Sequence, residues 1–239
     1  MEEKIMGIAE VENEQVAEHE AEQKAEQKVE QKAEQETELL RELGGYEFRK
    51  EYEKACRVLE KTLQKLNKEM SMRLNREYIS SIEWRVKSPE SCIGKMKHKE
   101  VELTLENAVN QLNDIAGVRV VCNFLDDMYE LCRLLVSDYD FELIKEKDYI
   151  KNPKRSGYQS LHLILWVPIG EDRRVKAEIQ ARTQAMDFWA GVEHHFVYKK
   201  DRDFGKDKDL EKDLRKCAKS IYKIDKKMMN IRNRMEQEA

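Results

Sequence analysis

The sequence predicts an α/β (α+β) protein with one mixed sheet of about five strands flanked by helices. Three observations indicate this fold: a period-two alternation of apolar residues at 78–88, a buried apolar run at 115–122, and two apolar runs at 161–167 and 173–182 that a turn joins. Helical patterns separate these strands. A chain in which strands and helices alternate in this way builds a sheet that helices cover.

The first 40 residues form an acidic, low-complexity tail. They carry 13 Glu and 4 Lys, a net charge of −9, whereas all 239 residues together carry −4, so the rest of the chain is mildly basic. Residues 17–36 repeat a four-residue unit whose period drifts around a helix and leaves no continuous apolar stripe. We expect residues 1–40 to be a frayed helix or disordered, with a partner-binding helix as the alternative.

The body of the chain, residues 41–205, begins with an amphipathic helix over 46–70, where apolar residues recur three or four positions apart. After the first strand, Ser88-Pro89-Glu90 is typical of a helix start. The elements that follow are a short helix at 107–113, the strand at 115–122, a helix that Asp126 and Asp127 cap and that runs to about 136, and a strand at 141–147.

The strands at 161–167 and 173–182 are expected to form a hairpin through the turn at 168–172. Alternate residues of the second strand are charged or polar, which indicates either a solvent-facing row or a site: Lys176, Glu178, Gln180 and Arg182. Thr183 is then expected to cap a helix. His194 and His195 in that helix point about 100° apart, so they do not suit one metal ion.

The C-terminal segment, residues 206–239, carries a heptad pattern. Its apolar residues are spaced alternately by four and three, which predicts a helix with one buried seam: Leu210, Leu214, Cys217, Ile221, Ile224, Met228, Ile231 and Met235. Two partners fit this seam, the chain's own helix at 46–70 or the same helices of a neighbouring subunit.

The stretch from Asp148 to His162 reads as a loop built to hold a nucleotide. Lys151, Lys154 and Arg155 offer positive charge to phosphates. Ser156 and Gly157 allow backbone N–H groups to approach an anion. Tyr158 offers an exposed aromatic face to a base. The alternative is an ordinary solvated hairpin loop whose charges keep the protein soluble.

Several other chemistries are excluded by the sequence. It holds no Walker loop, Rossmann fingerprint, nucleophile elbow or zinc-ligand pattern. The five cysteines form no C-x-x-C pair, and no apolar run is long enough to cross a membrane, so we expect a cytoplasmic protein with reduced thiols. Asp114 and Glu178, together with basic residues near strand ends, suit Mg²⁺ and phosphoryl-type transfer.

Four motifs follow one another in order along the body of the chain. They are Arg-Val-Lys-Ser at 85–88, Asp-Ile-Ala-Gly-Val-Arg at 114–119, Asp-Tyr-Ile with Ser-Gly-Tyr-Gln-Ser-Leu-His within 148–162, and Glu-Ile-Gln-x-Arg-Thr with Ala-Met-x-Phe-Trp-Ala within 178–190. This set resembles the synthetase domain of the RelA/SpoT homologue family. The chain is most similar to the single-domain small alarmone synthetases, because it lacks the His-Asp pair of the family's hydrolase domain.

The resemblance implies a nucleotidyltransferase-like fold that moves the β,γ-pyrophosphate of ATP to the 3′-hydroxyl of GTP or GDP, yielding pppGpp or ppGpp. It implies that Asp114 and Glu178 hold Mg²⁺ and that Glu178 takes the proton of the attacking hydroxyl. The ATP-binding residues would be Arg85, Lys87, Ser91, Lys95 and Arg119. The GTP- or GDP-binding residues would be Lys154, Tyr158, His162, Gln180 and Asp187, with Tyr158 stacked on the base.

The resemblance also implies a homo-oligomer, most simply a tetramer, with an alarmone or an RNA as candidate effector. This chain departs from the family pattern at His98, where many relatives have Arg, and at Asp187, where close relatives have Asn. An Asp accepts hydrogen bonds but donates none, so the choice between GDP and GTP stays open. The alternatives are a nucleotide- or RNA-binding regulator without turnover and a pyrophosphokinase that acts on an adenine nucleotide or an RNA acceptor.

One geometric condition follows from the spacing of Asp114 and Arg119. Residues five apart on a regular strand face opposite sides of the sheet. Asp114 therefore has to precede its strand if both side chains line one pocket.

Overall fold

The computed structural model of the chain describes residue 27, residues 30–198 and residues 208–238. These residues fall into two compact units: one takes in those up to Gly45 together with Ser88–Asn110, and the other takes in Tyr46–Lys87 together with those from Gln111 onward. Most of the predicted tail at 1–40 lies outside the described residues. Its last part is helical, within a helix that covers 30–44 and buries Leu39.

The smaller unit contains the helix at 30–44, α3 (Pro89–His98) and all but the last residue of α4 (Leu105–Gln111). The predicted start of α3 is confirmed, since the Ser88 side chain accepts a hydrogen bond from the N–H of Ser91 and Pro89 occupies the first turn. Lys97 Nζ lies 2.6 Å from a carboxylate oxygen of Glu36 and joins the two helices. The buried apolar residues of the smaller unit include Leu39, Leu43, Cys92, Ile93 and Met96.

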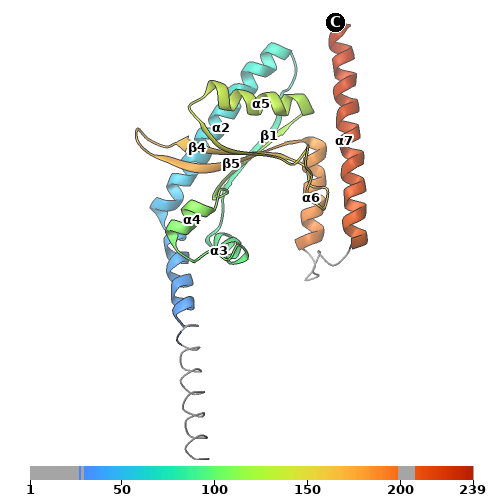
Figure 1. Ribbon diagram of the computed structural model, residues 1–239. Helices are drawn as coiled ribbons and strands as arrows, with labels where there is room; N and C mark the ends of the chain where they lie inside the picture. Colours follow the sequence, from blue (N-terminus) through green and yellow to red (C-terminus); the bar gives the residue numbers. More distant parts are fainter. Residues whose placement is uncertain (1–26, 28–29, 199–207, 239) are drawn as a thin grey trace, which may run out of the picture. The chain divides into compact units, whose positions relative to one another are not determined.

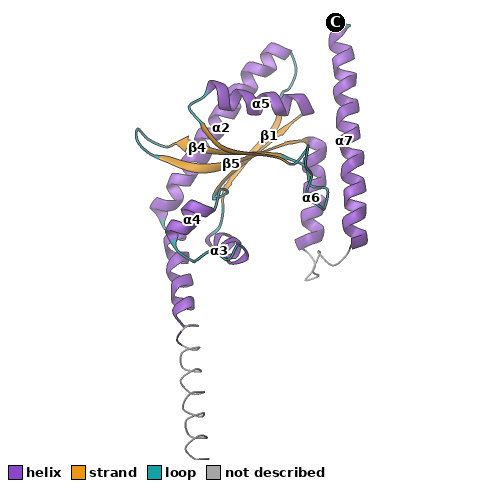
Figure 2. Cartoon of the chain, viewed as in Figure 1, coloured by secondary structure: helices purple, strands orange, loops and turns teal. Residues whose placement is uncertain are grey.

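The larger unit is built on a five-stranded mixed sheet, as the sequence predicted, and its strand order is β1-β2-β5-β4-β3 (Figures 1 and 2). The strands are β1 (Ile79–Val86), β2 (Ala116–Cys122), β3 (Glu142–Asp148), β4 (Leu161–Pro168) and β5 (Arg174–Thr183). Only the β2–β5 pair is parallel within the described sheet; the three other pairs are antiparallel. The central strand is β5, which lies between β2 and β4, and all three of these interior strands carry predicted site residues.

One face of this sheet packs against α2 (Tyr46–Leu74) and α5 (Leu125–Asp138). The helix α2 contacts β1, β2, β5 and β4, and it buries an apolar stripe that includes Leu59, Leu63 and Leu66. The residues that meet it are the small and branched ones on one side of β2 and β5: Val118, Val120, Ala177, Ile179 and Ala181. The alternate residues of these strands, which include Arg119, Glu178 and Gln180, lie on the opposite face.

The helices α6 (Gln184–Tyr198) and α7 (Lys208–Gln237) lie side by side (Figure 1). The heptad seam of α7 is only partly covered: Leu214 is buried, whereas Ile224, Met228 and Met235 are 55%, 50% and 66% exposed. The helix packs on α6 and α5 rather than along α2, whose apolar stripe is used by the sheet. The intramolecular pairing that the sequence suggested between α7 and the helix at 46–70 is therefore wrong.

Asp126 and Asp127 do not cap α5. Phe124 occupies the cap position without a side-chain hydrogen bond, and both acids lie in the first turn. Instead, both acids form ion pairs with arginines. Arg76 Nη1 lies 2.6 Å from Asp127 Oδ2, and Arg232 pairs with both Asp126 and Asp127. Arg76 lies in the turn that follows α2 and Arg232 lies on α7, so this ion-pair cluster joins the C-terminal end of α2 to α5 and α7.

All five cysteines are free thiols, and four of them, all except Cys217, are buried. Burial raises the pKa of Cys56 to about 12, which keeps that thiol protonated. Among the described residues, no helix has the length and apolar character needed to span a bilayer.

Candidate active site

The β3–β4 loop (residues 149–160) is held by hydrogen bonds at its start and at its tip. Asp148 Oδ1 accepts from the backbone N–H groups two and three residues further on, both at 2.9 Å. At the tip, Gly157 has φ of +98° and donates its N–H to the carbonyl of Lys154 at 2.8 Å. The expectation that this N–H serves an anion is therefore wrong in this conformation, because the turn itself uses the donor.

Tyr158 is buried, with 9% of its surface exposed, contrary to the exposed position that the sequence suggested. Its ring belongs to an apolar cluster with Trp189, Leu214 and Ala218, so α6 and α7 cover it. The ammonium of Lys154 lies over the ring, 4.7 Å from its centroid. A polar loop sequence indicates exposure, but the packing of α7 against the loop reverses it.

Five side chains form a closed ring of hydrogen bonds on the polar face of the sheet and in the adjoining loop. Glu178 Oε1 lies 3.1 Å from His162 Nδ1, and His162 Nε2 lies 2.9 Å from the hydroxyl of Tyr158. Arg182 Nη2 donates to that hydroxyl at 2.8 Å and to Gln180 Oε1 at 3.1 Å. Gln180 Nε2 closes the ring by donating to Glu178 Oε2 at 2.9 Å.

The ring fixes which atom of His162 carries hydrogen. A carboxylate only accepts, so Nδ1 of a neutral imidazole donates to Glu178 and Nε2 accepts from the hydroxyl of Tyr158. The tyrosine oxygen can then accept from Arg182, as its geometry requires. Three of the predicted acceptor-site residues, Tyr158, His162 and Gln180, are thus brought into direct contact with one another or with Glu178.

Glu178 is charged although only 7% of its surface is exposed. Burial by itself raises the pKa of this carboxyl, but the hydrogen bonds from His162 and Gln180 lower it by more, so the pKa lies below its ordinary value. The negative charge of Asp114 raises the pKa of Glu178, so the two carboxylates interact electrostatically. A charged, buried carboxylate next to a second acid suits a divalent cation or a proton acceptor.

Asp114 precedes β2, so the geometric condition on Asp114 and Arg119 is met. Lys87, at the end of β1, reaches across to it, with Nζ 3.0 Å from Asp114 Oδ2. The N–H of Lys87 also donates to the carbonyl of Ile115 at 2.8 Å, which holds the ends of the two strands together. A predicted donor-site lysine and a predicted catalytic acid are therefore neighbours.

A cavity of about 290 Å³ lies on the polar face of the sheet, over β1, β2 and β5. Two predicted donor-site residues, Arg85 and Arg119, line it together with Gln180, and Gly117 leaves room at its floor. Two further predicted donor-site residues, Ser91 and Lys95, lie on α3 in the smaller unit. The structure thus gathers three of the five predicted ATP ligands, Arg85, Lys87 and Arg119, on or beside one surface.

Asp187 is held between two arginines. Arg182 Nη1 lies 2.9 Å from its Oδ1, and Arg119 Nε lies 3.5 Å from the same oxygen. The acid therefore links a predicted donor-site arginine to the hydrogen-bonded ring. The polar row predicted for β5 includes Arg182, but no role in the site was predicted for it. Its position on the same side of β5 as Glu178 and Gln180 was the signal that could have identified it.

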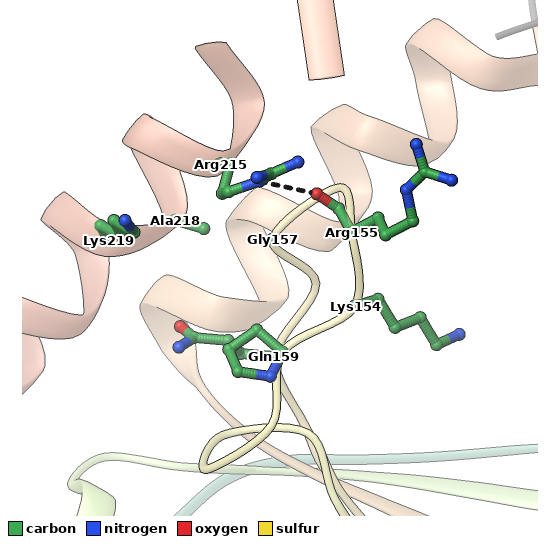
Figure 3. Close-up of a pocket in the computed structure, with 8 residues that line it drawn as sticks. Lys154, Arg155, Gly157, Gln159, Arg215, Ala218 and Lys219 are labelled. Atoms are coloured by element: carbon green, nitrogen blue, oxygen red, sulfur yellow. Dashed lines mark hydrogen bonds between the residues drawn. The ribbon is translucent and has the colours of Figure 1, made fainter. Parts of the chain in front are cut away.

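A second cavity, of about 590 Å³, lies between the β3–β4 loop and α7. Figure 3 shows Arg215 of α7 reaching toward the backbone of Arg155, where its Nε donates to the carbonyl oxygen at 2.9 Å. Lys154 and Arg155 extend their side chains on one side of the loop, while Lys219 lies on the other (Figure 3). The lining is basic, and it joins α7 directly to the loop that carries Tyr158.

The described residues contain no cluster of three or more His, Cys, Asp or Glu side chains with metal-site geometry. His194 and His195 are both exposed on α6. Asp114 and Glu178 would offer a cation only two protein ligands, and its remaining ligands would be phosphate oxygens and water.

Residues 84–203 match the model of the region found in RelA/SpoT proteins. This range is half of the chain, and it contains every predicted site residue. The chain belongs to the RelA/SpoT family. The GTP pyrophosphokinase YwaC of Bacillus subtilis is 37% identical over 188 residues, which cover 77% of this chain and 89% of that protein. The resemblance that the four motifs indicated is confirmed.

Solved RelA/SpoT relatives share the fold. The small alarmone synthetase 2 from Bacillus subtilis superposes with a TM-score of 0.68 at 36% identity, over 78% of this chain and 97% of that one. The small alarmone synthetase 1 from the same organism, bound to its product pppGpp, gives a TM-score of 0.69 at 29% identity, over 80% and 97%. The predicted fold class is therefore confirmed.

Proposed function

We propose that this RelA/SpoT protein is a GTP pyrophosphokinase that transfers the β,γ-pyrophosphate of ATP to the 3′-hydroxyl of GTP or GDP. The ring of hydrogen bonds around Glu178 is the observation that carries the proposal, because it sets a charged carboxylate among the residues assigned to the acceptor. The relative bound to pppGpp and the curated GTP pyrophosphokinases support the same reaction. The products would be AMP and pppGpp or ppGpp.

In the proposed reaction the 3′-oxygen bonds to the β-phosphorus of ATP while the bond from that phosphorus to the α-phosphate oxygen breaks. Glu178 accepts the hydroxyl proton, since its lowered pKa keeps it ionised and its hydrogen bonds to His162 and Gln180 fix its orientation. Mg²⁺, held by Asp114 and Glu178, would neutralise charge on the transferred phosphates. The donor set fits this ion, because two electrostatically coupled carboxylates are hard oxygen ligands.

The donor would lie over the cavity beside β1 and β2, with its phosphates near Arg85, Lys87 and Arg119. Their charges face the growing negative charge on the leaving AMP and on the pyrophosphate. Ser91 and Lys95 stay assigned to ATP through the family resemblance. Positioning and charge neutralisation of this kind account for most catalysis of phosphoryl-type transfer.

The acceptor would lie against the β3–β4 loop, with Lys154, Tyr158, His162, Gln180 and Asp187 as its ligands. A guanine base that stacks on Tyr158 competes with the ammonium of Lys154, which now lies over that ring. Lys154 would then turn toward the nucleotide phosphates. This exchange replaces a cation–π contact by base stacking and frees one positive charge for the ligand.

We also propose that the protein is a cytoplasmic homotetramer, with 41–205 as its catalytic domain and 206–239 as its oligomerisation helix. The exposed part of the α7 seam supports this assembly, because three large apolar side chains on one stripe of a helix favour a partner. An alarmone or an RNA is retained as candidate effector.

One assay tests the proposed function. Purified protein is incubated with Mg²⁺, ATP labelled at the γ-phosphate, and GTP, GDP, an adenine nucleotide or a short RNA in separate reactions. Label that moves to GTP or GDP, with release of AMP, supports the proposal. Transfer only to the adenine nucleotide or the RNA contradicts the choice of acceptor, and nucleotide binding without transfer to any acceptor indicates a regulator instead of an enzyme.

A further inference from the structure

Arg182 is a buried cation that touches three residues assigned to the acceptor. Only 5% of it is exposed. Its Nη2 donates to the Tyr158 hydroxyl and to Gln180 Oε1, and its Nη1 donates to Asp187 Oδ1 at 2.9 Å. Its guanidinium carbon also lies 5.2 Å from the centroid of the Tyr158 ring.

The chemistry of these contacts requires arginine. The guanidinium is a planar fork with five donors in fixed directions, so one side chain can meet three acceptors that diverge from it. A lysine in this place would present one compact charge to the same three acceptors. Burying a cation is costly without a counter-ion, and the carboxylate of Asp187 supplies it.

A structural ion pair is the alternative explanation for Arg182, since Asp187 stands in the first turn of α6 and the pair would fix that helix to β5. Two observations argue against this role being sufficient. The second nitrogen, Nη2, is directed at Tyr158 and Gln180 rather than at α6. Its Nε is buried without a hydrogen-bond partner among the described residues, whereas a purely structural arginine is expected to use its donors fully.

We propose that Arg182 is a positioning residue of the acceptor site, which holds Tyr158 and Gln180 in the orientation that presents the acceptor nucleotide to Glu178. The inference rests on the proposed function. The side chains of Tyr158 and Gln180 each have one further hydrogen-bond partner, His162 and Glu178 respectively, so Arg182 completes the hydrogen bonding of both. Without it, the tyrosine ring and the amide lose the group that links them across the sheet.

The test compares Arg182→Lys, Tyr158→Phe and the double variant. Arg182→Lys keeps the charge opposite Asp187 but removes the fork, and Tyr158→Phe keeps the aromatic face but removes the hydroxyl. Each single change is expected to raise the KM for GTP about tenfold, the loss typical of one hydrogen bond to a charged group, and to leave the KM for ATP within about twofold. Both single changes remove the contact between Arg182 and Tyr158. The KM for GTP of the double variant is therefore expected to lie within about twofold of the KM of the more impaired single variant.

Arg174→Lys is the matched control, because it makes the same substitution at the exposed start of β5 and pairs there with Asp140 and Glu142. It is expected to leave both KM values unchanged. Calorimetric titration of GDP in the absence of ATP gives a second measurement that needs no turnover. If the wild-type protein binds GDP but transfers nothing, the proposed function fails while the Kd values still test Arg182.

Three results would overturn the positioning role. The first is an unchanged KM for GTP and an unchanged Kd for GDP in Arg182→Lys. The second is an equal rise in the KM for both nucleotides together with a lower Tm, which a structural ion pair would give. The third is an additive loss in the double variant, which would mean that Arg182 does not act through Tyr158.

Discussion

Glu178 shows how the partners of one residue set its chemistry. The side chain is buried, and burial alone would favour the protonated, inactive form. The hydrogen bonds from His162 and Gln180 reverse that preference and also fix both carboxylate oxygens. The result is a carboxylate that is charged and oriented before any substrate binds, which is the condition for an effective general base.

Replacement of the two predicted catalytic acids tests this assignment. Glu178→Gln removes the proposed general base, so we expect turnover to fall by about 10²–10⁴-fold, the contribution typical of such a group. Asp114→Asn removes a negative charge from the proposed metal site, so we expect turnover to be lost there as well. Glu142→Gln, an exposed carboxylate at the start of β3, serves as the control and should retain full activity. Wild-type turnover in either site variant, measured as AMP release, would show that the assignment is wrong.

Asp225 is a second buried acid, and it lies on α7. The Thr183 hydroxyl donates to its Oδ2 at 2.8 Å. Burial raises the pKa of this carboxyl, and the hydrogen bond from Thr183 only partly lowers it again. A raised pKa in the folded state means that the stability it contributes is present below the unfolded pKa of roughly 3.9 and is lost as pH rises through the folded pKa.

Asp225→Asn removes that loss, because an amide stays neutral and its oxygen still accepts from Thr183. We expect the variant to have a higher Tm than the wild type at pH 7–8, and the difference to shrink as pH falls toward about 4. Asp213→Asn, on the exposed side of the same helix, lacks the buried environment and should show no such gain. A Tm difference that stays constant with pH would contradict the prediction.

At the level of elements, the β3–β4 loop and α7 form one structure. Gly157 approaches α7 so closely that a Cβ built on it would lie 2.8 Å from the Cβ of Ala218 and 2.9 Å from the Cα of Arg215. Arg215 in turn holds the carbonyl of Arg155. A loop that meets a helix backbone at these distances keeps its shape only while the helix is in place, so α7 is part of the support for Tyr158.

Gly157→Ala tests this support. The substitution places a side chain at φ of +98° and against the backbone of α7, which costs roughly 1–3 kcal/mol and pushes the loop off the helix. We expect a lower Tm and a higher KM for GTP with little change in the KM for ATP. Calorimetry and steady-state kinetics measure the two effects.

The matched control is Gly191→Ala on α6, where a Cβ meets nothing within 4 Å and the backbone is helical. Alanine there should stabilise the protein by about 0.5–1 kcal/mol, because glycine is unfavourable inside a helix. If Gly157→Ala behaved like Gly191→Ala, the loop would not depend on its contact with α7.

At the level of the whole molecule, α7 divides its seam between two tasks. In the first half of α7, Leu214 of the seam and Ala218 beside the seam are buried against α6 and the loop, whereas Cys217 is exposed. In the second half, Ile224 and Met228 of the seam are half exposed. An apolar groove of about 500 Å³ continues this exposed half past Phe124 toward the end of α2. A partner subunit that covers the second half would therefore bind the same helix that supports the acceptor loop.

Ile224→Glu combined with Met228→Glu places two charges in the exposed half of the seam, so we expect it to dissociate the proposed tetramer. Multi-angle light scattering should give about four times the chain mass of 28.4 kDa for the wild type and a smaller mass for the variant. Lys223→Glu with Asn230→Glu adds more negative charge to exposed positions outside the seam and should leave the assembly intact. A wild-type mass of one chain at every concentration would contradict the prediction.

Local patterns along the chain define the strands and most of the helices, and they single out the residues of the candidate site. Period-two alternation defined β1, and the polar row of β5 singled out Glu178 and Gln180, because side chains on a strand alternate between two faces whatever surrounds them. The family motifs supplied the carboxylates and basic residues. Each of these inferences depends on local periodicity or on residue type, which the order of amino acids contains directly.

The tertiary structure alone decided which residues meet across the molecule. The burial of Tyr158, the role of Arg182 as the link between Tyr158, Gln180 and Asp187, and the division of the α7 seam all depend on how α7 packs against α6 and the loop. A heptad pattern states that a helix has an apolar stripe but not what covers it. Packing angles and side-chain fit between elements distant in sequence decide that, and no local pattern records them.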